Sequence, residues 1–127
     1  MTDPELQATQ LLTLARALMR CSRSVGGGPR AGCLIARQAL EFVVDASLER
    51  HQMGYPRAPM RTKLICLDHA FADNPVIPFR IAMLWSQLSS ACHHHAYELD
   101  PSPHATEAMI EDIARLITAL ADQQHAL

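Results

Sequence analysis

Apolar residues recur every three to four positions along most of this 127-residue chain, which is the period of an amphipathic α-helix. The breaks in the pattern are rich in glycine and proline, most clearly at Gly26-Gly27-Gly28-Pro29, and such residues end helices and form turns. No stretch alternates apolar and polar positions as a half-buried strand does. The pattern therefore predicts an all-α fold, an antiparallel four-helix bundle plus one short helix. The expected helices span about 2–25, 30–52, 60–71, 78–99 and 103–124.

The predicted helix over 78–99 has two faces that each need a neighbour. One stripe at helical spacing is mainly apolar and is expected to join the core; it consists of Ile81, Leu84, Trp85, Leu88, Cys92, His95 and Leu99. The opposite half carries small side chains, which let a second helix approach closely, at Ala82, Ser86, Ser89 and Ser90. We therefore expect a homodimer through this helix.

Length and composition favour one helical domain over residues 1–127. The formal net charge is −2, so no overall field attracts nucleic acid or an anionic membrane. No apolar run is long enough to span a bilayer, and the residues after Met1 lack the basic and apolar regions of a signal peptide. We therefore expect a cytoplasmic protein without a membrane segment. The four cysteines form no Cys-x-x-Cys pair and are expected to be reduced thiols: Cys21, Cys33, Cys66 and Cys92.

Two charged rows lie on predicted helix surfaces and are interpreted as solvated. They consist of Arg16, Arg20 and Arg23 in the first helix and of Glu41, Asp45 and Glu49 in the second. Arg37 precedes Glu41 by four residues, a spacing at which the two side chains can pair.

The histidine-rich segment at the end of the fourth predicted helix offers a metal site. Cys92, His95 and His104 are the candidate ligands, because they place sulfur and nitrogen donors within thirteen residues. Adjacent histidines on a helix point about 100° apart, so His93, His94 and His95 cannot form one three-ligand face. The chain has no second pair of ligands elsewhere. A small metal-binding protein is therefore the weaker alternative, and no cofactor is expected.

The same histidines suggest acid–base chemistry. A histidine near the end of a helix is favoured in its cationic form by the helix dipole. His93 or His94, paired across a dimer interface, could act as base and acid in RNA cleavage with the ribose 2′-hydroxyl as nucleophile. Such a site needs a cation for the phosphate, and Arg37 is the candidate. In the alternative interpretation these histidines cap helix carbonyls or pack at an interface, and His95 is structural.

A family resemblance rests on three segments in order. The segment Ala36-Arg37-Gln38-Ala39-Leu40-Glu41, the short third helix, and a fourth helix with a histidine before a proline-containing turn together resemble HEPN-domain proteins. Residues 102–120 are similar to the last helix of that family, so the resemblance spans about 16–120. It implies an all-α bundle, commonly dimeric through the helices that carry the motif. The active members are metal-independent RNases of toxin–antitoxin and phage-defence systems, with an Arg followed after four to six residues by a His.

The chain departs from that motif at its arginine. Four to six residues before His93, His94 or His95 stand residues 86–90, and none of them is Arg. Gln87 is the nearest polar substitute and carries no charge. The missing arginine removes the usual phosphate contact, so the sequence favours a non-catalytic member of the family.

We therefore expect a HEPN-like binding or regulatory module, set in a defence or toxin–antitoxin-like system. The expected binding residues are Gln87, His94, Arg80 and Tyr97. An RNase that uses His93 or His94 with Arg37 is the alternative, with RNA or a nucleotide as its partner.

Overall fold

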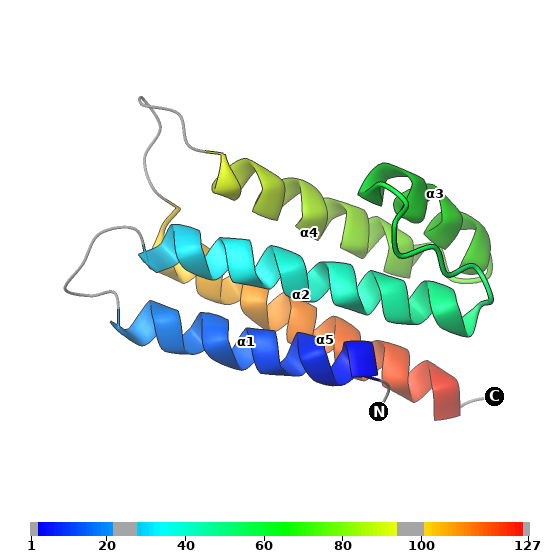
Figure 1. Ribbon diagram of the computed structural model, residues 1–127, viewed down its shortest axis with the longest axis horizontal. Helices are drawn as coiled ribbons and strands as arrows, with labels where there is room; N and C mark the ends of the chain where they lie inside the picture. Colours follow the sequence, from blue (N-terminus) through cyan, green and yellow to red (C-terminus); the bar gives the residue numbers. More distant parts are fainter. Residues whose placement is uncertain (1–2, 22–27, 94–100, 126–127) are drawn as a thin grey trace.

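The computed structural model describes residues 3–21, 28–93 and 101–125. In these ranges the chain forms five α-helices and no strand, which confirms the all-α prediction (Figure 1). The helices are α1 (Asp3–Cys21), α2 (Gly28–Arg50), α3 (Met60–Ala70), α4 (Val76–Cys92) and α5 (Pro103–His125). None of the helices in the described ranges combines the length and apolar character needed to cross a bilayer.

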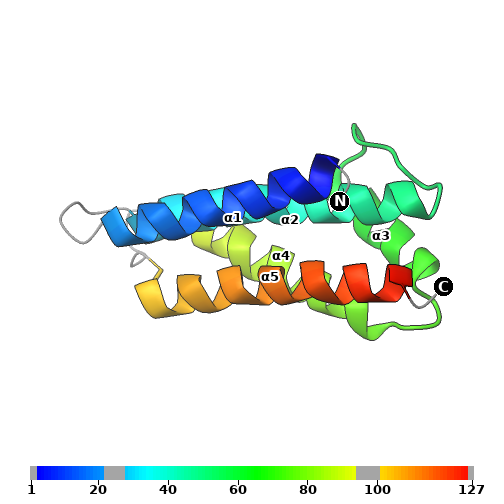
Figure 2. The same ribbon diagram turned by 90° about the horizontal axis from the view of Figure 1, so that it is seen from below.

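Four of the helices form an antiparallel bundle. α1, α2, α4 and α5 lie along one common direction; α1 and α4 run one way along it, and α2 and α5 run the other way (Figures 1 and 2). α2 packs against all the other helices, whereas α1 and α4 occupy opposite corners and do not touch. The short α3 lies against α2 and α4 at the end of the bundle where α1 begins and α5 ends (Figure 1). This is the predicted four-helix bundle with one short additional helix.

Apolar stripes of α2 and α5 form much of the core. On α2 one stripe at helical spacing is fully buried: Cys33, Ala36, Leu40, Val43, Val44 and Ser47. Ala39, Ala46 and Leu48 beside it are buried as well. α5 contributes Ile110, Ile113 and Leu116 from the opposite corner. Gly32 lies where three helices converge, since a Cβ atom there would be 3.0 Å from Met19 Sδ and 3.4 Å from Thr106 Cγ2. The absence of a side chain at Gly32 therefore allows α1 and α5 to approach α2 closely.

The helix ends agree with the sequence in one case and differ in another. α5 begins as predicted, with Pro103 as its first residue and the Ser102 hydroxyl accepting a hydrogen bond from the Ala105 N–H at 3.0 Å. The predicted continuous helix over 78–99 is wrong at its end, because α4 ends at Cys92 and His93 is extended. Residues 94–99 lie outside the described residues.

A buried lysine corrects the prediction that the acidic row of α2 is simply solvated. Lys63 of α3 is 1% exposed, and its Nζ lies 2.8 Å from Asp45 Oδ1 and 3.5 Å from Glu41 Oε1. Nζ also donates a hydrogen bond to the carbonyl of Pro56 at 3.0 Å. Glu41 and Asp45 of this row therefore attach α3 and the preceding loop to α2, whereas Glu49 is exposed. One member of the arginine row also forms an ion pair, since Arg16 Nη2 lies 2.8 Å from Glu111 Oε1 on α5.

Candidate functional site

A cleft opens between α2, α4 and the start of α3. It has a volume of about 390 Å³ and is lined by Leu34, Arg37, Gln38, Glu41, Met60 and Trp85. The four residues from α2 share one helix face, because their spacing of three to four residues matches the helical period. Trp85 comes from α4 and Met60 from the first turn of α3, so the cleft lies where these three helices meet. We refer to it as the Arg37 cleft.

Arg37 is held against α4 by two contacts. The central carbon of its guanidinium lies 4.3 Å from the centroid of the Trp85 ring, a cation–π arrangement. Its Nε donates a hydrogen bond to the Ser89 hydroxyl at 3.2 Å. These contacts point the side chain toward α4, and the carboxylate of Glu41, which could have paired with it, instead lies 3.5 Å from Lys63.

Arg30 explains how α4 ends. Its Nη1 donates hydrogen bonds to the carbonyl oxygens of Ala91, at 3.1 Å, and of His93, at 2.6 Å. The last carbonyls of a helix have no partner within the helix and carry its negative dipole end, so a guanidinium there is stabilising. Arg30 and Arg37 stand seven residues apart, two turns of α2, and both contact the second half of α4.

The candidate catalytic residues are only partly described. Arg37 contacts Ser89, which stands four residues before His93, so this arginine lies beside the helix that leads to the histidines. His93 is the exposed C-cap residue of α4. His94 and Tyr97, the other expected catalytic and binding residues, lie outside the described residues.

The remaining two predicted binding residues share one groove. Arg80 and Gln87 line a hollow of about 190 Å³ between α4 and α5, together with Phe79, Met83, Leu84 and Asp112. Arg80 is half-buried there, and Gln87 is exposed.

The outward side of α4 carries an exposed apolar stripe. Val76, Phe79 and Met83 are 58%, 66% and 47% exposed, and their spacing of three and four residues aligns them on one face. The exposed Ser86 and Ser90 continue the same line toward the end of the helix. We call these five residues the outer stripe. All five residues are exposed, so no other helix of the described ranges covers the outer stripe.

Helical spacing in the sequence predicts only part of these surfaces. The small side chains on the far half of α4 were predicted, but the bulky residues at the beginning of that face were not. The signal was present, because Val76, Phe79 and Met83 stand at helical spacing. The stacking of Arg37 on Trp85 had no such signal, since periodicity does not show which residues of two helices meet.

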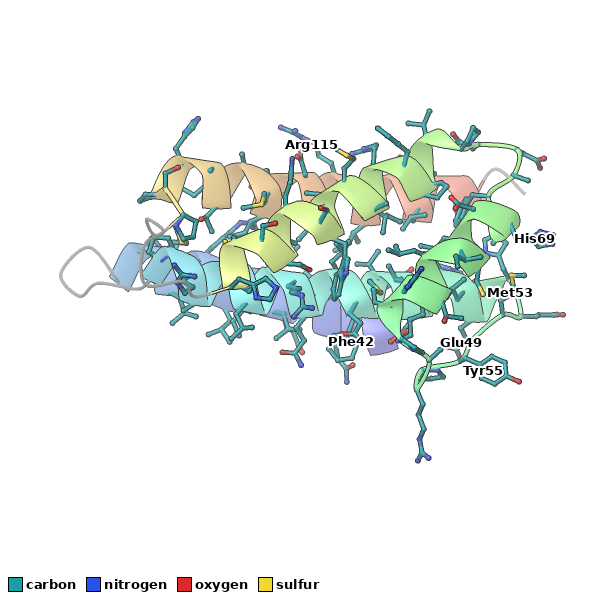
Figure 3. All side chains as sticks on the ribbon, turned by 90° about the horizontal axis from the view of Figure 1, so that it is seen from above. Phe42, Glu49, Met53, Tyr55, His69 and Arg115 are labelled. Atoms are coloured by element: carbon teal, nitrogen blue, oxygen red, sulfur yellow. The ribbon has the colours of Figure 1, made fainter. Side chains whose placement is uncertain are left out.

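The expected metal ligands do not form a site within the described part of the chain. That part contains no group of three or more histidine, cysteine or acidic side chains that could hold a metal ion. Cys92 is half-buried, and burial raises the pKa of its thiol, which disfavours the thiolate that binds metal. His104 is exposed at the start of α5, and His95 lies outside the described residues. The isolated His69 also projects outward, at the end of α3 (Figure 3).

Comparisons of the chain with models of protein families, with curated proteins and with solved structures find no match. The described elements define an antiparallel helical bundle with an exposed apolar face on α4, the mixed polar and apolar Arg37 cleft, and a second mixed hollow between α4 and α5.

Proposed function

We propose that the protein is a HEPN-like, non-catalytic binding module that acts as a homodimer through the outer stripe of α4. The observation that carries this proposal is the exposure of Val76, Phe79 and Met83 on one uncovered helix face. Isolated exposed apolar side chains are ordinary, but a contiguous exposed apolar patch marks an interaction surface. The proposed setting is a cytoplasmic defence or toxin–antitoxin-like system, as the family resemblance implies.

The outer stripe favours a second copy of the same chain as its occupant. Its bulky residues stand in the first half of α4 and its small residues in the second half. Val76 and Ser90 are each seven residues from Met83, so two antiparallel copies of α4 that cross at Met83 place each valine against a serine. A twofold dimer requires such a self-complementary patch. The stripe itself contains no charged side chain, so the crossing brings no like charges together at its centre.

The size of the surface predicts a dimer of moderate affinity. Full burial of one Val, Met or Phe side chain contributes about 1.5–3 kcal/mol. The three residues are about half exposed, so each adds about 1–2 kcal/mol, and six such side chains take part in the dimer. Association itself opposes binding by several kcal/mol. We therefore expect a dissociation constant of about micromolar magnitude.

The test compares two matched charge substitutions by sedimentation equilibrium over a range of protein concentrations. Met83→Glu places a charge at the centre of the outer stripe, where the side chain is 47% exposed. Leu14→Glu places the same charge at a 46% exposed leucine on α1, at the opposite corner of the bundle. We expect Met83→Glu to be monomeric and Leu14→Glu to dimerise as the wild type does. A monomeric wild type, or equal effects of the two substitutions, would refute the proposed interface.

An RNase with an altered site is the second candidate function. The position of Arg37 beside Ser89, one turn before His93, favours it, because a cation there can reach the end of α4. This candidate predicts RNA cleavage that persists in EDTA and is lost in His94→Ala and in Arg37→Gln. The non-catalytic proposal predicts no cleavage above the level of the His94→Ala protein.

A further inference from the structure

The Arg37 cleft has the composition of a small-molecule site and shares no residue with the outer stripe. Its apolar walls come from Leu34, Met60 and Trp85, and its polar groups from Arg37, Gln38 and Glu41. Sites for small ligands in proteins typically measure about 300–1,000 Å³ and combine apolar walls with a few placed polar groups. At about 390 Å³, the cleft fits a ligand at the small end of this range.

The Arg37 guanidinium is held in place by α4 but keeps hydrogen-bond donors for a ligand. One face stacks on Trp85 and Nε bonds to Ser89, whereas Nη1 and Nη2 have no hydrogen-bond partner in the described ranges. A carboxylate accepts two parallel hydrogen bonds from such a pair of nitrogen atoms. Because stacking already restricts the side chain, Arg37 loses little conformational freedom when a ligand binds.

Glu41 supplies the opposite charge on the same wall. It stands one turn further along α2, which corresponds to a rise of about 6 Å along the helix. Its side chain is 44% exposed, and the Nζ of Lys63 lies closer to Asp45, at 2.8 Å, than to Glu41, at 3.5 Å. Glu41 therefore keeps the capacity to accept a hydrogen bond from a cationic group in the cleft. A doubly charged phosphate has no cationic group to pair with this carboxylate and would be repelled by it.

We propose that the Arg37 cleft binds a hydrophobic α-amino acid as a zwitterion, with its carboxylate on Arg37 and its ammonium group toward Glu41. The ligand's apolar side chain lies against Leu34, Met60 and Trp85. The charge pattern selects this class over a phosphate ester, which has no cationic group for Glu41. All of the lining residues come from one copy of the chain, so binding does not depend on the proposed dimer.

The fluorescence of Trp85 provides a direct assay, because Trp85 is the only tryptophan in the chain. L-leucine and L-phenylalanine are titrated against the wild-type protein, beside N-acetyl-L-leucine, L-leucinamide and inorganic phosphate. We expect a saturable change with at least one amino acid and at least about tenfold weaker binding of both capped leucines. The absence of saturation with both amino acids, equal binding of the capped compounds, or tighter binding of phosphate would overturn the proposal.

Two substitutions separate a binding role from a structural one. Arg37→Gln should abolish the preference for leucine over leucinamide, since the carboxylate loses its partner. Glu41→Gln should abolish the preference for leucine over N-acetyl-leucine. Arg20→Gln, which removes an exposed arginine on α1, serves as the control and should leave both preferences unchanged. If circular dichroism shows a folded protein and either preference survives its substitution, the assignment of that group is wrong. The monomeric Met83→Glu variant should bind leucine as the wild type does, so the two proposals fail separately.

Discussion

Lys63 is the only lysine of the chain, and it is nearly inaccessible to water at 1% exposure. Its ammonium group bonds to Asp45 and to the carbonyl of Pro56, which join α3 and the preceding loop to α2. A charge removed from water needs such partners, and the loss of one partner leaves the other charge unpaired. We therefore expect Lys63→Met, which keeps an unbranched side chain one atom shorter and removes the charge, to destabilise the fold.

The expected loss of unfolding free energy follows from the exposure of Asp45, the ion-pair partner of Lys63. Breaking a fully buried ion pair by removing one member destabilises a protein by about 3–5 kcal/mol. Asp45 is 21% exposed and gains some hydration, so we expect about 2–3 kcal/mol for Lys63→Met. For a domain of this length the corresponding fall in Tm is about 10 °C. Glu41→Gln should lower the free energy of unfolding by less than about 1 kcal/mol, because its contact is longer and more exposed.

Urea unfolding followed by the fluorescence of Trp85 measures these differences. The double variant Lys63→Met/Asp45→Leu removes both charges and should recover most of the lost stability, since no unpaired charge remains. Arg61→Met, which removes an exposed cation from the same helix, should change the stability by less than about 0.5 kcal/mol. The explanation is refuted if Lys63→Met is as stable as Arg61→Met, or if the double variant is no more stable than Lys63→Met.

Three further predictions concern other contacts. Arg50→Met leaves the buried carboxylate of Glu5, its ion-pair partner at the start of α1, without a charge partner, and should lower the free energy of unfolding in urea by about 1–3 kcal/mol. Ser102→Ala removes the N-cap hydrogen bond of α5 and should lower the free energy of unfolding by about 1 kcal/mol, whereas Ser102→Asp should retain it. Burial raises the pKa of the Cys33 thiol above its ordinary value, so a thiol reagent should modify the half-buried Cys66 well before Cys33. The stabilisation that the raised pKa of Cys33 gives the folded state is fully present below the ordinary thiol pKa and is lost as the pH rises through the raised pKa. The fall in Tm between neutral and alkaline pH should therefore be smaller in Cys33→Ala than in the wild type.

The fold could be predicted because the helices of the bundle carry apolar stripes at helical spacing. In α2 the spacing of Ala36, Leu40 and Val43 identifies the buried face, and all three are inaccessible to water. The turns were equally clear, since glycine and proline restrict the positions at which a helix can continue. The start of α5 at Pro103 follows directly from the preceding serine.

The candidate sites depend on contacts between helices, which helical periodicity does not contain. The end of α4 is bonded to Arg30, a residue sixty-one positions before Ala91 in the sequence. Asp45 looked like part of a solvated row because its partner Lys63 belongs to another helix. Lys63 itself stands at the helical spacing of the inward residues Met60 and Leu67, and this position was the one available signal for its burial.

The most direct test of the homodimer adds one cysteine to the chain at the proposed twofold axis. Helices that pack about 8–10 Å apart, with backbone radii of about 2.3 Å, bring facing Cα atoms to about 4–5 Å, which is near the range that a disulfide spans. We expect Met83→Cys to become a covalent dimer under mild oxidation, and Leu14→Cys to remain no more cross-linked than the wild type. If Met83→Cys forms no more covalent dimer than Leu14→Cys, two copies of α4 do not cross at Met83 and the proposed interface is wrong.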